Sequence, residues 1–113
     1  MLETTNRVEN LIGTYLKILR TKDIPVDQVY LFGSQAKGTS TPNSDIDVII
    51  VSPAFSGMPV WKRWEVIGDA LTEVLEPIEI LSYSPEEFNT QKNKPASFLR
   101  HILEQKETIR LTI

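Results

Sequence analysis

The sequence predicts an α/β fold (α+β in its mixed sheet) in which helices flank a small mixed central sheet. Long stretches with apolar residues at helical spacing alternate with short β-branched runs. The expected order is helix, strand, turn, strand, helix, strand, helix, helix, which is typical of helices layered on a sheet. With 113 residues and 41% hydrophobic content, the chain is expected to form one domain over residues 1–113.

The first helix is predicted from a run of apolar residues spaced three and four apart: Val8, Leu11, Ile12, Tyr15, Leu16 and Leu19. Asn6 followed by Glu9 suggests a capping box at its start. Pro25 ends it, and residues 26–32 then form the first expected strand, which runs into Gly33-Ser34. A short helical turn is expected from Gln35, before a loop.

Residues 46–51 are apolar on both faces after Asp47 and are expected to form a central strand. A second helical stripe follows: Val60, Trp64, Ile67, Leu71, Val74 and Leu75. The third strand is expected at 78–83, and Ser84-Pro85 with Glu87 predicts the start of a short helix. A last helix is expected from Phe98, and the alternation at 108–113 indicates either a short edge strand or a frayed tail.

Charge and composition exclude several classes of protein. A net charge of −3 argues against strong binding of long nucleic acid. The absence of cysteine excludes disulfides and thiol chemistry. The N-terminal residues lack an apolar signal core, and the longest apolar run is too short to cross a membrane. We therefore expect a cytoplasmic protein without a membrane partner.

Two short segments carry the chemistry. Gly33 lets backbone approach a ligand closely, and the Ser34 hydroxyl with nearby N–H groups can bind phosphate oxygens. Asp45 and Asp47 have the spacing of side chains on one strand face. Neighbouring carboxylates repel each other unless a cation lies between them, and Mg²⁺ is usually held by carboxylates and substrate phosphates. The pattern predicts phosphoryl or nucleotidyl transfer; the alternative is an ordinary loop followed by two solvated acids.

Gly33-Ser34, ten residues, then Asp45-x-Asp47 resembles the motif of the DNA polymerase β-like nucleotidyltransferase superfamily, in its minimal nucleotidyltransferase branch. Ala36-Lys37-Gly38 fits the same motif, with Lys where Arg is more usual, and Ser44 matches the serine before the acids. The resemblance implies transfer of a nucleoside monophosphate from a nucleoside triphosphate to an acceptor hydroxyl, and ATP is the expected triphosphate. It also implies two Mg²⁺ ions, with Mn²⁺ as an alternative, and release of pyrophosphate.

The resemblance also implies a third acid from a later strand, for which Glu79 is the candidate. The branch more often has Asp there, and the alternative is a Glu on a solvent-facing strand side. Lys37 is expected either to contact the triphosphate or to be a solvated lysine.

Other polar and aromatic residues are considered for the site. Arg63 is expected on a solvated helix face rather than at the phosphates, and Trp64 in the core. Trp61 stays open as a residue that stacks on a base, and His101 is interpreted as structural or surface.

A binding role is the second hypothesis. Minimal nucleotidyltransferases resemble the antitoxin half of pairs whose other half is a HEPN-domain protein, so this chain is alternatively an antitoxin-like or regulatory partner of such a protein. It would bind that partner and could transfer a nucleotide to it. Assembly into a homo-oligomer also stays open.

Overall fold

The computed structural model describes residues 2–40 and 45–112. The helices are α1 (Leu2–Thr21), α2 (Gly33–Lys37), α3 (Val60–Leu71), α4 (Pro85–Lys92) and α5 (Phe98–Glu104), with a 3-10 turn, η1, at Pro53–Phe55. The strands are β1 (Gln28–Phe32), β2 (Ile46–Val51), β3 (Ile78–Tyr83) and β4 (Ile109–Leu111). The predicted α/β class is confirmed.

The four strands form one mixed sheet in the order β3-β2-β1-β4. β1 is antiparallel to β2 and to β4, while β2 and β3 are parallel. The parallel pair requires a crossover, which α3 provides. The C-terminal alternation is thus resolved as a short edge strand, because Ile109 and Leu111 pair with β1.

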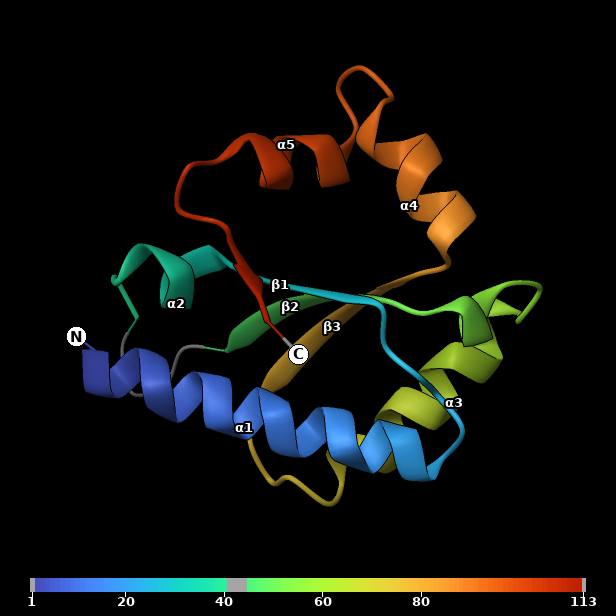
Figure 1. The fold of residues 1–113 in the computed structure, drawn as a ribbon, viewed down its shortest axis with the longest axis horizontal. Coiled ribbons are helices and arrows are strands. Elements are labelled where there is room, and N and C mark those ends of the chain that lie inside the picture. Colours follow the sequence, from blue (N-terminus) through green and yellow to red (C-terminus); the bar gives the residue numbers. More distant parts are fainter. Residues whose placement is uncertain (1, 41–44, 113) are drawn as a thin grey trace.

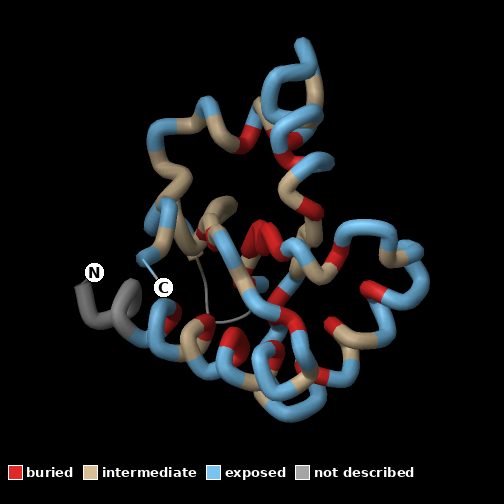
Figure 2. Tube along the Cα trace, turned by 45° about the vertical axis from the view of Figure 1, so that its right-hand side comes forward, coloured by how far each residue is buried: buried red, intermediate tan, exposed pale blue. Residues whose placement is uncertain are grey.

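Helices cover both faces of the sheet (Figure 1). α1 and α3 lie on one face, and their larger buried cluster includes Ile12, Leu19, Val48 and Ile67. α4 and α5 lie on the other face over a smaller buried cluster: Ile49, Val51, Phe88, Leu99 and Ile102. Figure 2 shows the buried positions along the strands and on the inward sides of the helices. In the part of the chain that the structure describes, no helix is both long enough and apolar enough to span a bilayer.

Local geometry corrects one predicted helix start and confirms another. α1 begins at Leu2, so Asn6 lies inside the helix rather than at its start. The capping box at Ser84 is confirmed: its Oγ accepts from the Glu87 N–H at 3.2 Å, and the Glu87 carboxylate accepts from the Ser84 N–H at 2.8 Å. Pro85 at the first helical position needs no such acceptor.

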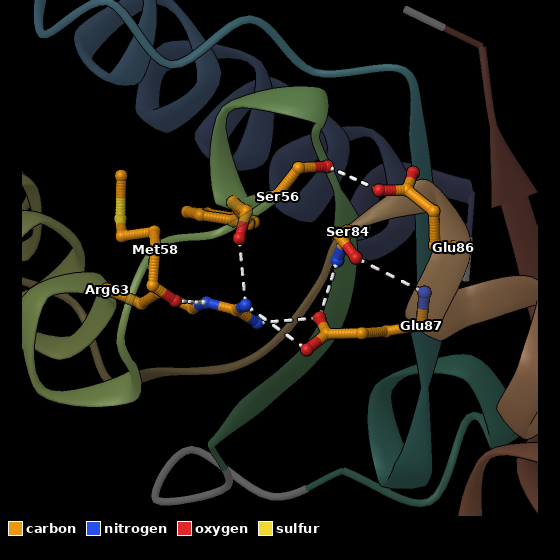
Figure 3. Close-up of polar contacts among 7 residues, drawn as sticks. Ser56, Met58, Arg63, Ser84, Glu86 and Glu87 are labelled. Atoms are coloured by element: carbon orange, nitrogen blue, oxygen red, sulfur yellow. Dashed lines mark hydrogen bonds and ion pairs between the residues drawn. The ribbon is translucent and has the colours of Figure 1, made fainter.

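The orientation of α3 differs from the prediction. Trp64 is 69% exposed and Trp61 63% exposed, whereas Arg63 is only 6% exposed. The Arg63 guanidinium donates to both Glu87 carboxylate oxygens, at 2.7 and 3.1 Å, and to the backbone carbonyls of Phe55 and Met58 (Figure 3). A buried arginine with this many acceptors is satisfied, so the helix turns Arg63 inward and the two tryptophans outward. Arg63 is therefore neither solvated nor free to bind phosphate.

Candidate active site

The candidate site is built on one row across three strands. Asp47 in β2 is the register partner of Phe32 at the end of β1 and of Glu79 in β3. Register partners project to the same face of a sheet. The structure therefore brings together two of the acids that the sequence places 32 positions apart, because β2 and β3 are adjacent and parallel.

Alternation along β2 decides which face carries the acids. Ile46, Val48 and Ile50 are buried in the cluster with α1 and α3, whereas Ile49 and Val51 are buried in the cluster with α4 and α5. Since side chains two apart share a face, Asp47 lies on the α4–α5 face, one step before Ile49. The acids thus lie near the start of β2 and β3, on the same face as α4 and α5.

Gly33 places the start of α2 directly against Asp47. Its φ is +74°, in the left-handed region that favours glycine. A Cβ added to Gly33 would collide with the Asp47 Oδ2 atom. The glycine is therefore required both for the turn out of β1 and for the close approach of that turn to the carboxylate.

The charge on Asp47 is disfavoured by its surroundings. The pKa of Asp47 is raised from the ordinary value of 3.8 to about 6, and burial is the largest cause. The Glu79 carboxyl adds to the increase through a hydrogen bond and through its charge, and Asp45 adds a smaller electrostatic effect. Acids held this close carry a negative potential that a cation would relieve.

The other predicted residues that the structure describes come from α2, α5 and the residue before β2. Asp45 is exposed immediately before β2, and Glu79 is also exposed. Ser34 is the second residue of α2, and Lys37 is its last residue and is exposed. Ser44 falls outside the described residues. His101 is exposed on α5, as expected of a surface residue, at 3.1 Å from the amide nitrogen of Gln105.

The donor set fits a hard divalent cation in its chemistry. Asp45, Asp47 and Glu79 offer carboxylate oxygens, the ligands that Mg²⁺ prefers. Within residues 2–40 and 45–112, no three His, Cys, Asp or Glu side chains are already gathered as a metal-binding group. The pair Asp47–Glu79 is therefore the assembled part of the set, and Asp45 stands beside it.

A hollow of about 270 Å³ opens beside the two acids. Besides Asp47 and Glu79, its lining consists of Phe32, Leu81 and Phe98. The sequence gives no sign of this role for Phe98, because its place in an apolar helical stripe predicts core packing. A larger hollow, about 360 Å³, lies between α1 and β4 and contains none of the predicted site residues.

Comparison with known proteins agrees with this geometry. Residues 12–108 match the family model of the nucleotidyltransferase domain. The chain belongs to this nucleotidyltransferase family. The sequence resemblance to the polymerase β-like nucleotidyltransferase family is thereby confirmed at the level of this domain.

The chain is also similar to individual proteins, at low sequence identity. The chain is 29% identical over 70 residues to the protein adenylyltransferase MntA of Shewanella oneidensis, a match covering 61% of this chain and 50% of that protein. It therefore spans about half the length of this curated relative. A crystal structure of a proposed nucleotidyltransferase from Sulfolobus solfataricus has the same fold, with a TM-score of 0.64 and 18% identity over 96% of this chain and 83% of that one. A chain of a toxin–antitoxin crystal structure with AMP-PNP is 31% identical, over 66% of this chain and 56% of its own, with a TM-score of 0.49.

Proposed function

We propose that this nucleotidyltransferase moves a nucleoside monophosphate from a nucleoside triphosphate to an acceptor hydroxyl and releases pyrophosphate. The expected triphosphate is ATP. The observation that carries the proposal is the Asp47–Glu79 pair, set against the Gly33 turn at the end of β1. The hydroxyl oxygen forms a bond to the α-phosphorus, and the bond from that phosphorus to the bridging oxygen breaks in line. The electron pair of the broken bond leaves with pyrophosphate.

Each residue has a proposed part in this reaction. The Ser34 hydroxyl donates a hydrogen bond to a phosphate oxygen. Lys37, at the far end of α2, supplies a positive charge for the triphosphate. Ser44 is proposed to help bind the nucleotide. Glu79, the exposed member of the acid pair, accepts the proton of the acceptor hydroxyl. These groups act mainly by positioning the reactants and stabilising charge.

Asp45, Asp47 and Glu79 are proposed to hold Mg²⁺, two ions in the full site, with Mn²⁺ as a substitute. When bound, the cation neutralises phosphate charge and makes the α-phosphorus more electrophilic. The support is the adjacency of Asp47 and Glu79 in the sheet, with Asp45 directly before β2; the pKa of Asp47 is raised first by burial and further by these two acids. We expect ATP affinity to be lost in EDTA.

The acceptor is proposed to be a hydroxyl on a protein. The support is the relative named a protein adenylyltransferase, with which the chain shares 29% identity over 70 residues. The second hypothesis is an antitoxin-like or regulatory partner of a HEPN-domain protein. Its defining outcome is a stable complex with that protein, with or without transfer of a nucleotide to it.

The test is label transfer from ATP labelled at the α-phosphate, with Mg²⁺ and cell lysate. We expect label on a macromolecule with the parent protein and a loss of about 100-fold or more with Asp47→Asn, the scale seen when electrostatic stabilisation of a transition state is removed. Glu65→Gln, which changes an exposed acid on α3, is the matched control and should retain transfer. Equal transfer by the parent and Asp47→Asn would contradict the proposal.

A further inference from the structure

We propose that Phe98 and the hollow in front of it bind the nucleobase of the triphosphate. This inference rests on the proposed function, because it names the place of one part of that substrate. It adds a residue from the C-terminal layer that neither the motif nor the acid row contains.

The lining of the hollow matches a neutral planar ring. Phe32 from β1, Leu81 from β3 and Phe98 from α5 give it three apolar walls, and Asp47 and Glu79 form the remaining side. Its volume of about 270 Å³ is just below the roughly 300–1,000 Å³ of sites that enclose a whole drug-sized ligand. It therefore suits one ring system rather than an entire nucleotide.

Phe98 is exposed although the helix that carries it is firmly placed. The Ser97 hydroxyl accepts from the Arg100 N–H at 3.0 Å and donates to the Gln91 carbonyl at 2.6 Å. Leu99 and Ile102 are buried against the sheet. Phe98 nevertheless remains 61% exposed and lines the hollow beside the acids. The backbone that carries Phe98 is thus fixed, so a ring that stacks on Phe98 costs only the rotamer freedom of an aromatic side chain with two χ angles.

The direction of the nucleotide favours the base over the phosphates. Gly33 and Ser34 follow β1, on one side of Asp47, whereas Glu79 and Leu81 belong to β3 on its other side. Phosphates at the Gly33 turn would place the nucleoside end toward β3 and α5. With the carboxylates occupied by Mg²⁺ and the phosphates at the Gly33 turn, the apolar side of the hollow remains for the base.

The experiment compares two ligands by calorimetry with Mg²⁺ and no acceptor: ATP, and ribose 5′-triphosphate, which lacks the base. Stacking on an aromatic side chain contributes about 1–3 kcal/mol per base, so Phe98→Ala should weaken ATP binding by about 5- to 150-fold. Affinity for ribose 5′-triphosphate should not change. Phe98→Trp should restore ATP affinity, because it restores a stacking surface.

Trp64→Ala is the matched control, since Trp64 is an aromatic side chain on α3 with a similar exposure, 69%. It should leave both affinities unchanged. Equal weakening of both ligands by Phe98→Ala would make Phe98 structural and overturn the inference. Unchanged ATP affinity with a raised KM for the acceptor would assign the hollow to the acceptor and also overturn it. If the parent protein binds neither ligand, the proposed function itself is contradicted. If the parent binds both ligands and Phe98→Ala does not selectively weaken ATP, only this inference is contradicted.

Discussion

Asp47 is both a proposed metal ligand and a residue whose protonation affects the stability of the fold. Its pKa of about 6 in the folded chain exceeds the 3.8 of a free aspartate. Between these values the folded state binds the proton more tightly than the unfolded state does. The contribution of this carboxyl to the free energy of unfolding is thus fully present below about pH 4, where both states are protonated. It is lost as the pH rises through 6.

The resulting prediction is made for the metal-free protein. Measured by urea unfolding in EDTA, the free energy of unfolding of Asp47→Asn minus that of the parent should increase between pH 4 and pH 6 and then level off, because only the parent has to ionise this carboxyl. Asp69→Asn, at an exposed position on α3, should show no such trend. A constant difference across the range would mean that burial and Glu79 do not raise the pKa of Asp47.

Gly33 provides the second residue-level prediction, and Gly57 provides its control. Both have φ of +74°, but only at Gly33 would a Cβ meet another atom within 4 Å, and that atom belongs to Asp47. Alanine at either position should cost roughly 1–2 kcal/mol for the left-handed backbone. Gly33→Ala should in addition displace Asp47 and abolish ATP binding, whereas Gly57→Ala should retain it. Melting curves and calorimetry together measure the two effects; similar ATP affinities in the two variants would separate Gly33 from the site.

Among the elements, α3 shows best where sequence reasoning succeeds and where it does not. The apolar spacing gives the helix and its start at Val60, and Ile67 is buried as the stripe predicts. The same stripe predicts Trp64 inside, but the helix is rotated so that Arg63 takes the inner position. The acceptors that make this possible are the Glu87 carboxylate and two backbone carbonyls, which no local pattern reveals.

The strands were the more predictable elements, because their alternation is local. β2 and β3 have the predicted bounds, and acids at Asp47 and Glu79 interrupt otherwise apolar runs.

The position of Phe98 beside the acids could not be predicted, because it depends on contacts that are distant in the sequence. Its neighbours Leu99 and Ile102 are buried, and only the folded arrangement of α5 over the acids leaves its ring beside a hollow.

The Arg63–Glu87 ion pair joins α3 to the start of α4 and gives the prediction at this scale (Figure 3). Hydrogen bonding to Arg63 is the main cause that lowers the pKa of Glu87. Arg63→Met should destabilise the fold by about 1–3 kcal/mol, since charged hydrogen bonds are lost and two carbonyls lose a donor. Lys62→Met, at the exposed neighbouring position, should change stability by less than about 0.5 kcal/mol. ATP affinity should be unchanged in both; weaker binding by Arg63→Met alone would return Arg63 to the phosphate site.

At the scale of the whole molecule, the sheet separates two layers of unequal strength. α1 buries Val8, Ile12, Tyr15 and Leu19 in the larger cluster, whereas α4 and α5 bury only Phe88, Leu99 and Ile102 in the smaller one. The acid pair stands on the face under the weaker layer. A site placed there can admit a substrate by local opening without unfolding the larger core.

Hydrogen exchange measures this difference directly. The backbone amides of α5 should exchange faster than those in the middle of α1, because less apolar area must be exposed to open α4 and α5. Adding ATP and Mg²⁺ should slow exchange in α5 more than in α1, since a base held between Phe98 and Leu81 connects α5 to the sheet. The same addition to Phe98→Ala is the control and should leave exchange in α5 faster than in the parent complex. Uniform protection of both helices by ATP would mean that the nucleotide stabilises the fold as one unit and that the α4–α5 layer does not open separately.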